Sequence, residues 1–196
     1  VNRLQAEGVR AGEGEVLVTG AGGGVGSIAV LLLSRLGYDV AAVTGRAELG
    51  EQLTRLGAAR ILTRDEVLKS TGKVLDKEQW SGAIDAVGGP LLGEVLKKIR
   101  YGGAVAAIGN AGGLGWDASV IPFILRNISL CGIDTVMQPY EARRSAWDRL
   151  TTLFVPAAFE PMLTEARLED LPGLAAQLLE GEIAGRVIIN PRDPPT

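Results

Sequence analysis

The chain has 196 residues, of which 46% are hydrophobic, so it is long enough for one sizeable α/β domain with a buried core. Its net charge of −3 argues against a nucleic-acid-binding surface, and no apolar run reaches the roughly 18 residues of a membrane span. The chain has no histidine and one cysteine, which excludes Ser-His-Asp and Cys-His catalysis and a zinc site with nitrogen and sulfur ligands. We therefore expect no catalytic residue and no metal site, and a cofactor to carry any chemistry.

The cysteine count and the first residues bear on the compartment. Cys131 has no second cysteine with which to form an internal disulfide, and the N-terminal residues have no signal-peptide pattern. Both observations fit a reducing environment, and we expect a cytoplasmic protein.

The stretch around which the rest of the chain is organised reads EVLVTGAGGGVG and spans residues 15–26. Val16–Val18 is apolar and predicts a buried strand, and residues 27–36 predict an apolar helix. Between them lies a glycine-rich turn. A strand, a glycine turn and a helix in this order indicate dinucleotide binding, because residues without Cβ let the backbone approach a diphosphate while free N–H groups at the helix start point at it.

The glycine frame can be read in two ways. One is Ala21-x-Gly23-x-x-Gly26, with alanine in place of the first glycine of GxGxxG. The other, which starts at Thr19, is TGxxxGxG, typical of short-chain dehydrogenases. That class needs Tyr-x-x-x-Lys for proton transfer, and none of the three tyrosines has a lysine four residues later. The sequence therefore disfavours the short-chain class.

The end of the second predicted strand, residues 39–43, bears on the choice of cofactor. NAD-specific sites usually have Asp or Glu here, which accepts a hydrogen bond from the ribose 2′-OH. This strand ends instead in Thr44-Gly45-Arg46, and a guanidinium suits a 2′-phosphate. We expect NADP(H) rather than NAD. The alternative is that Arg46 only begins a solvated helix.

Two later strand ends are predicted to meet at the same crevice. The fourth strand ends at Val87-Gly88, and the fifth opens into a second glycine loop that begins at Gly109, Asn110 and Ala111. Small residues there would leave room for ribose and nicotinamide, because ligands bind at the carboxyl ends of parallel strands. The alternative is ordinary turn glycines. Asp85 is expected to accept hydrogen bonds from backbone N–H groups rather than to act in catalysis.

Alternating strands and helices with short connections predict a doubly wound Rossmann fold, which is a parallel six-stranded sheet in the order 3-2-1-4-5-6 with helices on both faces. We assign residues 1–183 to this NADP-binding domain and 184–196 to a C-terminal strand and tail. The predicted strands are 16–18, 39–43, 60–62, 81–87, 104–108 and 128–133.

Several segments together resemble one known family. VLVTGAGGGVGSIAV, VTGR, AIDAVGG, YGGAVAAIGNAGG, PFILRNISLCGID and GRVIINP resemble the medium-chain dehydrogenase/reductase superfamily over about residues 12–191. Within it, they resemble the zinc-independent, quinone-oxidoreductase-like branch and its acryloyl-CoA reductase group. The resemblance implies NADPH-dependent reduction of an activated C=C bond in an enoyl-CoA or enone, with hydride transfer from the nicotinamide.

The same resemblance implies roles for individual residues. The glycine turn and Val25 would line the diphosphate, the residues after the second strand would hold the 2′-phosphate, and the later strand ends would border the ribose and nicotinamide. Asp134 would lie near the carboxamide, and Arg186 resembles a basic residue beside the cofactor. The candidate cofactor-binding residues are Gly22, Gly23, Gly24, Val25, Gly26, Thr44, Arg46, Val87, Gly88, Gly109, Asn110, Ala111, Asp134 and Arg186.

The sequence departs from the family in one respect. Family members have a β-rich catalytic domain before the nucleotide-binding domain, and the closing strand GRVIINP would return to it. We therefore expect this chain to bind NADP(H) weakly and to show no turnover alone. A non-catalytic NADP-binding sensor or scaffold module is the alternative. The apolar sixth strand predicts a homodimer that forms by edge-to-edge pairing.

Overall fold

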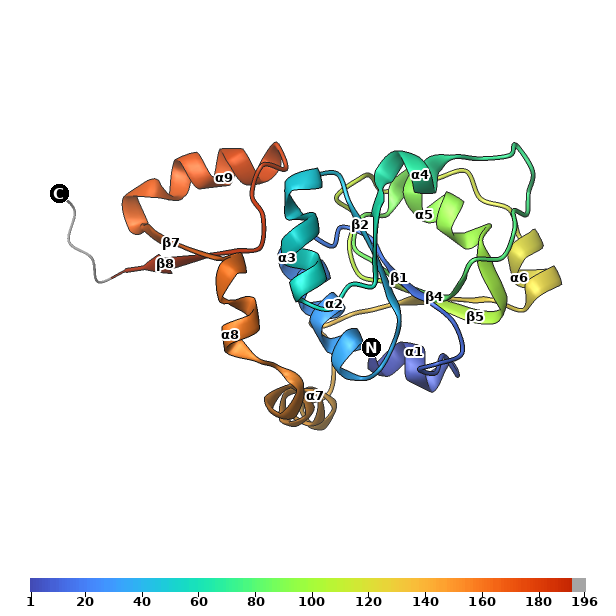
Figure 1. The fold of residues 1–196 in the computed structure, drawn as a ribbon, viewed down its shortest axis with the longest axis horizontal. Helices are drawn as coiled ribbons and strands as arrows, with labels where there is room; N and C mark the ends of the chain where they lie inside the picture. Colours follow the sequence, from blue (N-terminus) through green and yellow to red (C-terminus); the bar gives the residue numbers. More distant parts are fainter. Residues whose placement is uncertain (192–196) are drawn as a thin grey trace.

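In the computed structural model, which describes residues 1–191, the first two thirds of the chain build a six-stranded parallel sheet (Figure 1). Its strand order is β3-β2-β1-β4-β5-β6, so the predicted fold class, strand number and order are confirmed. The strands are β1 (Val16–Val18), β2 (Val40–Thr44), β3 (Arg60–Thr63), β4 (Trp80–Asp85), β5 (Ile99–Ala107) and β6 (Ser129–Gly132).

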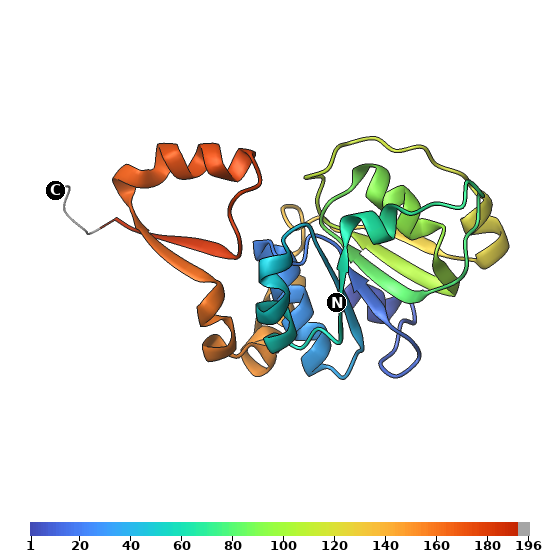
Figure 2. The same ribbon diagram turned by 45° about the horizontal axis from the view of Figure 1, so that its top comes forward.

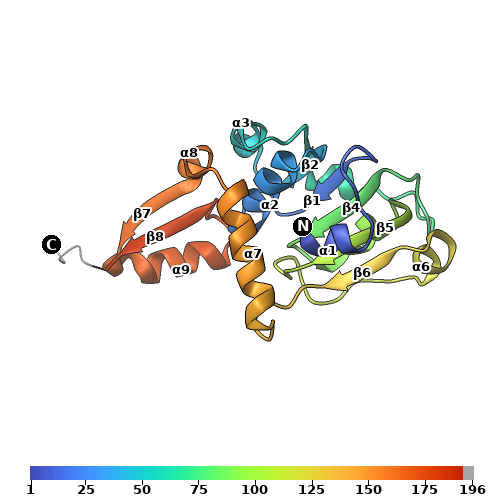
Figure 3. The same ribbon diagram turned by 90° about the horizontal axis from the view of Figure 1, so that it is seen from below.

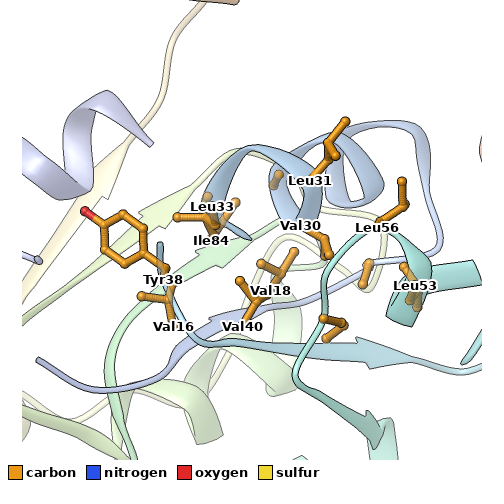
Figure 4. Close-up of a cluster of buried hydrophobic side chains, with 14 of the residues drawn as sticks. Val16, Val18, Val30, Leu31, Leu33, Tyr38, Val40, Leu53, Leu56 and Ile84 are labelled. Atoms are coloured by element: carbon orange, nitrogen blue, oxygen red, sulfur yellow. The ribbon is translucent and has the colours of Figure 1, made fainter. Parts of the chain in front are cut away.

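Helices cover both faces of this sheet because the central strands carry apolar side chains on each side. Val16 and Val18 of β1 pack in one hydrophobic cluster, while Leu17 between them packs in the other. The first cluster, drawn in Figure 4, includes side chains of α1, α2 and α3, and the second includes side chains of α4 and α5. The helices of this part are α1 (Asn2–Ala6), α2 (Gly24–Arg35), α3 (Gly50–Arg55), α4 (Arg64–Leu68), α5 (Gly89–Leu96), α6 (Ile121–Arg126) and α7 (Tyr140–Leu153).

Two strands begin earlier than the sequence predicted: β4 begins at Trp80 rather than at residue 81, and β5 begins at Ile99 rather than at residue 104. The first half of β5 includes Gly102 and Gly103 and is exposed from Arg100 to Gly102. Its register with β4 also shifts between Trp80 and Gly82. An exposed, glycine-containing strand has neither the apolar run nor the alternation from which strands are predicted.

A second, smaller unit follows the sheet and stands to one side of it (Figure 2). β7 (Leu163–Arg167), α9 (Leu171–Leu179) and β8 (Arg186–Asn190) form a β-α-β unit whose two strands are parallel. Figure 3 shows α7 between this unit and the six-stranded sheet. The chain enters the unit through α8 (Pro156–Phe159), and Phe159 is buried in the main core.

The predicted division at residue 183 stays a prediction. β8 pairs with β7, which precedes that position, rather than with the six-stranded sheet. Residues 192–196 of the predicted tail lie outside the described residues. Within residues 1–191, no helix combines the length and apolar character that a bilayer crossing requires.

A close backbone approach lies between the turn after β1 and the start of α2. A Cβ atom placed on Gly26 would overlap the carbonyl oxygen of Gly20, and it would lie 2.7 Å from Cα of Ala21. Both obstacles are main-chain atoms, so no side-chain rotation relieves the overlap. Gly26 therefore lets α2 pack directly against the turn that follows β1.

This contact predicts a loss of stability for Gly26→Ala. The substitution should lower the free energy of unfolding by about 1–3 kcal/mol, because the backbone must shift to admit the methyl group. Urea unfolding followed by circular dichroism measures the change. Gly50→Ala is the matched control: its Cβ would lie 4.0 Å from Ile61, which is ordinary contact, and alanine favours the helix. Equal stabilities for the two variants would contradict the packing argument.

Candidate nucleotide-binding site

The start of α2 presents a group of backbone donors at the glycine turn. Gly23 is the N-cap residue and provides no side-chain cap, and the N–H groups of Gly24, Val25 and Gly26 have no acceptor among residues 1–191. The turn itself is closed by a hydrogen bond of 3.0 Å from Gly23 N–H to the carbonyl of Gly20. Unpaired N–H groups at the positive end of a helix form an anion-binding arrangement.

A segment near the C-terminus crosses this turn. The N–H of Gly185 donates to the carbonyl of Gly22 at 2.9 Å. The guanidinium of Arg186 lies over Gly24, where an added Cβ would be 2.5 Å from the Arg186 Nε atom. We call residues 182–186 the crossing segment. It brings a positive charge to the donors of α2 from Arg186, which lies 162 residues after Gly24 in the chain.

The end of β2 meets the same turn. Thr44 Oγ1 accepts from the N–H of Arg46 at 3.1 Å, and it lies 3.4 Å from where a Cβ of Gly22 would be. The guanidinium of Arg46 donates to the carbonyls of Glu182 at 3.1 Å and Ile183 at 2.8 Å. Arg46 therefore does more than begin a solvated helix, since its side chain holds the crossing segment beside the turn.

Behind the turn, a buried hydrogen-bond network joins β1 to the end of β4. The hydroxyl of Thr19 donates to Asp85 at 2.5 Å and accepts from the N–H of Ala86 at 3.1 Å. The other carboxylate oxygen of Asp85 accepts from the N–H of Gly88 at 2.8 Å. Thr19 and Asp85 are fully buried. Asp85 thus caps a backbone N–H, that of Gly88, as expected, and β4 ends at Asp85 rather than at Val87.

The ends of β4 and β5 lie together, as predicted. The N–H of Gly112 donates to the carbonyl of Val87 at 2.7 Å, and a Cβ on Gly88 would be 3.2 Å from Cα of Asn110. A Cβ on Gly109 would be 2.6 Å from the carbonyl of Ala86. Val87 also contacts the first glycine turn through its Cγ2 atom, 3.1 Å from a Cβ placed on Gly20. Asn110 and Ala111 are exposed.

Asp134 forms its hydrogen bonds within its own loop. Its carboxylate accepts from the N–H groups of Val136 and Met137 in its own loop, at 2.9 and 3.0 Å. It lines a separate groove of about 680 Å³ between α1, the end of α2 and α7, which includes the exposed Trp147. None of the other predicted residues lines this groove. A role for Asp134 beside the cofactor stays a prediction.

A further hollow, of about 640 Å³, opens between the ends of β2 and β3. Thr44 and Gly45 line one side of it, and Thr63, Arg64 and Asp65 line the other. Sequence reasoning missed Arg64. The available signal was its position directly after the third strand, at the same sheet edge as Arg46. The segment after that strand is polar and has no glycine pattern, so it did not indicate a binding site.

Two interactions fix α4, the helix that begins with Arg64. Thr63 and Glu66 form a capping box, in which the carboxylate of Glu66 accepts from the N–H of Thr63 at 2.7 Å. This hydrogen bond lowers the pKa of Glu66 below its ordinary value. At the other end, Lys98 Nζ donates to the carbonyls of Val67 and Lys69, and burial lowers the pKa of Lys98.

Among residues 1–191, no cluster of three or more His, Cys, Asp or Glu could hold a metal ion.

The sheet order, the glycine turn and the free donors of α2 define a nucleotide-binding Rossmann-type domain. A family model described as zinc-binding dehydrogenase matches residues 24–152, and the chain belongs to this family.

Individual relatives agree with this assignment. The chain is 50% identical over 190 residues to the acrylyl-CoA reductase AcuI of Ruegeria pomeroyi, covering 97% of this chain and 58% of the relative. Its structure is similar to the yhdH oxidoreductase of Salmonella enterica solved in complex with NADP, with a TM-score of 0.92, 45% identity, and coverage of 97% and 58%. It is also similar to yhfP of Bacillus subtilis solved with NAD bound, with a TM-score of 0.90, 44% identity, and coverage of 97% and 58%. The chain thus spans about 58% of the length of these relatives.

The network behind the turn predicts that Asp85→Ala destabilises the domain by about 1–3 kcal/mol. The substitution leaves the buried N–H of Gly88 without its acceptor and the buried hydroxyl of Thr19 without its 2.5 Å partner. Urea unfolding measures the difference. Asp117→Ala is the control, because Asp117 is exposed and its side chain makes no hydrogen bond among residues 1–191, so a change within about 0.5 kcal/mol is expected. Similar losses in both variants would show that the network is unimportant.

Proposed function

We propose that this chain is the nucleotide-binding part of an NADPH-dependent reductase that acts on activated C=C bonds, of the acryloyl-CoA or quinone and enone type. The proposal is carried by the backbone N–H groups of Gly24, Val25 and Gly26 at the start of α2, which we call the cradle. These three donors have no acceptors among residues 1–191, and the guanidinium of Arg186 lies over Gly24. Backbone donors at a helix start with a cation beside them fit a diphosphate.

The surroundings support NADP(H) as the nucleotide. The end of β2 carries a hydroxyl and a guanidinium, and no carboxylate directly follows the strand, where NAD-specific sites place one. The relative from Salmonella enterica was solved with NADP, whereas the one from Bacillus subtilis was solved with NAD. The proposed preference of this chain is therefore a higher affinity for NADPH than for NADH.

In this proposal the chain binds and orients the cofactor and provides no acid or base. When bound, NADPH would supply the hydride for the reduction. Val87, Gly88 and the residues 109–111 would border the ribose and nicotinamide. Asp85 is engaged by Thr19 and the N–H of Gly88, so its carboxylate is not available for proton transfer. A non-catalytic NADP-binding module is the second candidate, and the engagement of the Asp85 carboxylate favours it for the chain alone.

The cradle gives a direct binding prediction. Gly24→Ala should weaken both NADPH and NADH at least tenfold, which is about 1.4 kcal/mol, because the methyl group enters the diphosphate space. The fold should be unaffected, since the three atoms nearest to the added Cβ all belong to the movable side chain of Arg186. Isothermal titration calorimetry measures both dissociation constants, and Gly173→Ala in α9, which has open space around it, is the control. A chain that binds neither nucleotide at millimolar concentration would refute the proposed function.

Activity requires a separate test, because the chain spans about 58% of its relatives. We expect no oxidation of NADPH by acryloyl-CoA with this chain alone. A chimera in which residues 1–196 replace the matching part of the Ruegeria pomeroyi acrylyl-CoA reductase should catalyse that oxidation, which is followed by NADPH absorbance. A chimera that binds NADPH but stays inactive would favour the non-catalytic module.

We also propose homodimer formation through β6. This strand is at the edge of the six-stranded sheet, so its outer N–H and C=O groups are available for pairing with a second copy. Analytical ultracentrifugation of the chain should show a dimer, and a monomer at high concentration would contradict the pairing.

A further inference from the structure

The loop after β5, residues 109–117, has few contacts that hold it in place, and we call it the second glycine loop. Four of its nine residues are glycine, which loses more conformational freedom on ordering than any other residue. No side chain of the loop makes a hydrogen bond or an ion pair among residues 1–191. The hydrogen bond from Gly112 N–H to the carbonyl of Val87 ties it to the end of β4. Beyond this hydrogen bond, the loop depends on packing for a defined position.

One side chain of the loop provides that packing. From Asn110 to Ala118, every residue is exposed except Trp116, which is half-buried and packs against the second hydrophobic cluster. Its indole lies on α5 at Gly93. A Cβ added there would be 3.1 Å from Cδ1 of Trp116 and 3.3 Å from the carbonyl oxygen of Asp117. The absence of a side chain at Gly93 therefore admits both the ring and the loop backbone beside it.

The polar atom of the Trp116 side chain is not used in this contact. Nε1 of Trp116 is buried and has no hydrogen-bond partner among residues 1–191. A buried N–H without an acceptor destabilises a fold, so a hydrogen bond does not explain an indole at this position. What Trp116 contributes is the area of its ring against α5.

The loop that Trp116 holds begins at the end of the sheet where the cofactor site is predicted. A Cβ on Gly89, the first residue of α5, would be 2.5 Å from the carbonyl oxygen of Gly112. Gly93 follows Gly89 by about one helical turn. The loop is thus fitted along the first turns of α5, and the ring at Gly93 sets its position relative to the end of β4.

We propose that Trp116 is a positioning residue for the nicotinamide half of the nucleotide site, because its ring on Gly93 fixes the second glycine loop. The inference rests on the proposed function, in which residues 109–111 border the ribose and nicotinamide. Without the ring, the glycine-rich loop would be free to move, and nucleotide binding would have to order it at a cost in affinity. The adenosine end is assigned to the end of β2, so its binding would be unchanged.

The inference predicts a selective loss of affinity. Trp116→Ala should weaken NADPH about tenfold and leave adenosine 2′,5′-bisphosphate, which has no nicotinamide half, within twofold. Trp116→Phe should stay within threefold of the parent chain for NADPH, because most of the ring area is kept and Nε1 has no partner to lose. Trp147→Ala is the control, since Trp147 is 64% exposed on α7.

A second variant changes the same contact from the other side. Gly93→Ala places a methyl group against the indole and should weaken NADPH severalfold, again without a change for the bisphosphate. Alanine is a better helix former than glycine, so α5 should stay folded in this variant. Gly93→Ala therefore keeps the inference testable if Trp116→Ala does not fold.

The experiment is isothermal titration calorimetry of each variant with NADPH and with adenosine 2′,5′-bisphosphate, together with amide hydrogen exchange of residues 109–117 followed by mass spectrometry. Exchange should be faster in Trp116→Ala and Gly93→Ala and unchanged in Trp116→Phe. NADPH affinities within twofold of the parent chain in both alanine variants would overturn the inference. An equal weakening of the bisphosphate would also overturn it, because that result indicates a general structural role.

The parent chain separates this inference from the proposed function. If it binds neither NADPH nor the bisphosphate, the proposed function itself fails. If it binds both and the variants weaken both equally or neither, the role of Trp116 alone fails.

Discussion

The contact of Gly26 with the carbonyl of Gly20 is the constraint on which the rest of the site depends. Because Gly26 has no side chain, α2 can begin close to the carboxyl end of β1. Its first N–H groups therefore lie at the sheet edge. A side chain at this position would push the helix start away from that edge. The anion-binding donors and the packing of the first hydrophobic cluster therefore have the same cause.

Four chain segments that are distant in sequence meet at this edge through polar contacts in addition to hydrophobic packing. The Asp85 carboxylate joins the end of β4 to β1 by way of Thr19, and Arg46 joins the end of β2 to the crossing segment. Gly185 adds a hydrogen bond to the glycine turn itself. The β7-α9-β8 unit has little buried surface of its own, since no residue of α9 is buried. These hydrogen bonds therefore help to determine where the unit and Arg186 lie.

Much of the fold could be predicted from the sequence because buried parallel strands have continuous apolar runs and the glycine turn is a strong local signal. The strand order and the meeting of the β4 and β5 ends followed from these features. The start of β5 could not be predicted, because its exposed, glycine-containing half has no hydrophobic pattern. The start of α2 was placed three residues late, since glycine has a low helix propensity and the helix begins at Gly24 only through tertiary packing.

The parts of the candidate site that the backbone forms could be predicted from the sequence. The parts that side chains from distant segments form were harder to predict. Arg46 was identified from its place after β2, but its hydrogen bonds to Glu182 and Ile183 join residues 136 and 137 positions apart, a relation with no local signature. Arg64 was missed because its position in the hollow beside Gly45 depends on β3 lying next to β2 and on its side chain reaching toward Gly45. Asp134 follows the sixth strand, yet its loop folds onto its own N–H groups and turns toward α7.

The most direct test of the account is a ¹⁵N–¹H correlation spectrum of the chain titrated with NADPH. The account predicts that the largest amide shifts fall on Gly24, Val25 and Gly26, where the donors without acceptors lie, with further shifts at Gly45 and Arg46. Shifts concentrated instead around Trp147 and the groove beside α7, with the glycine turn unchanged, would contradict it.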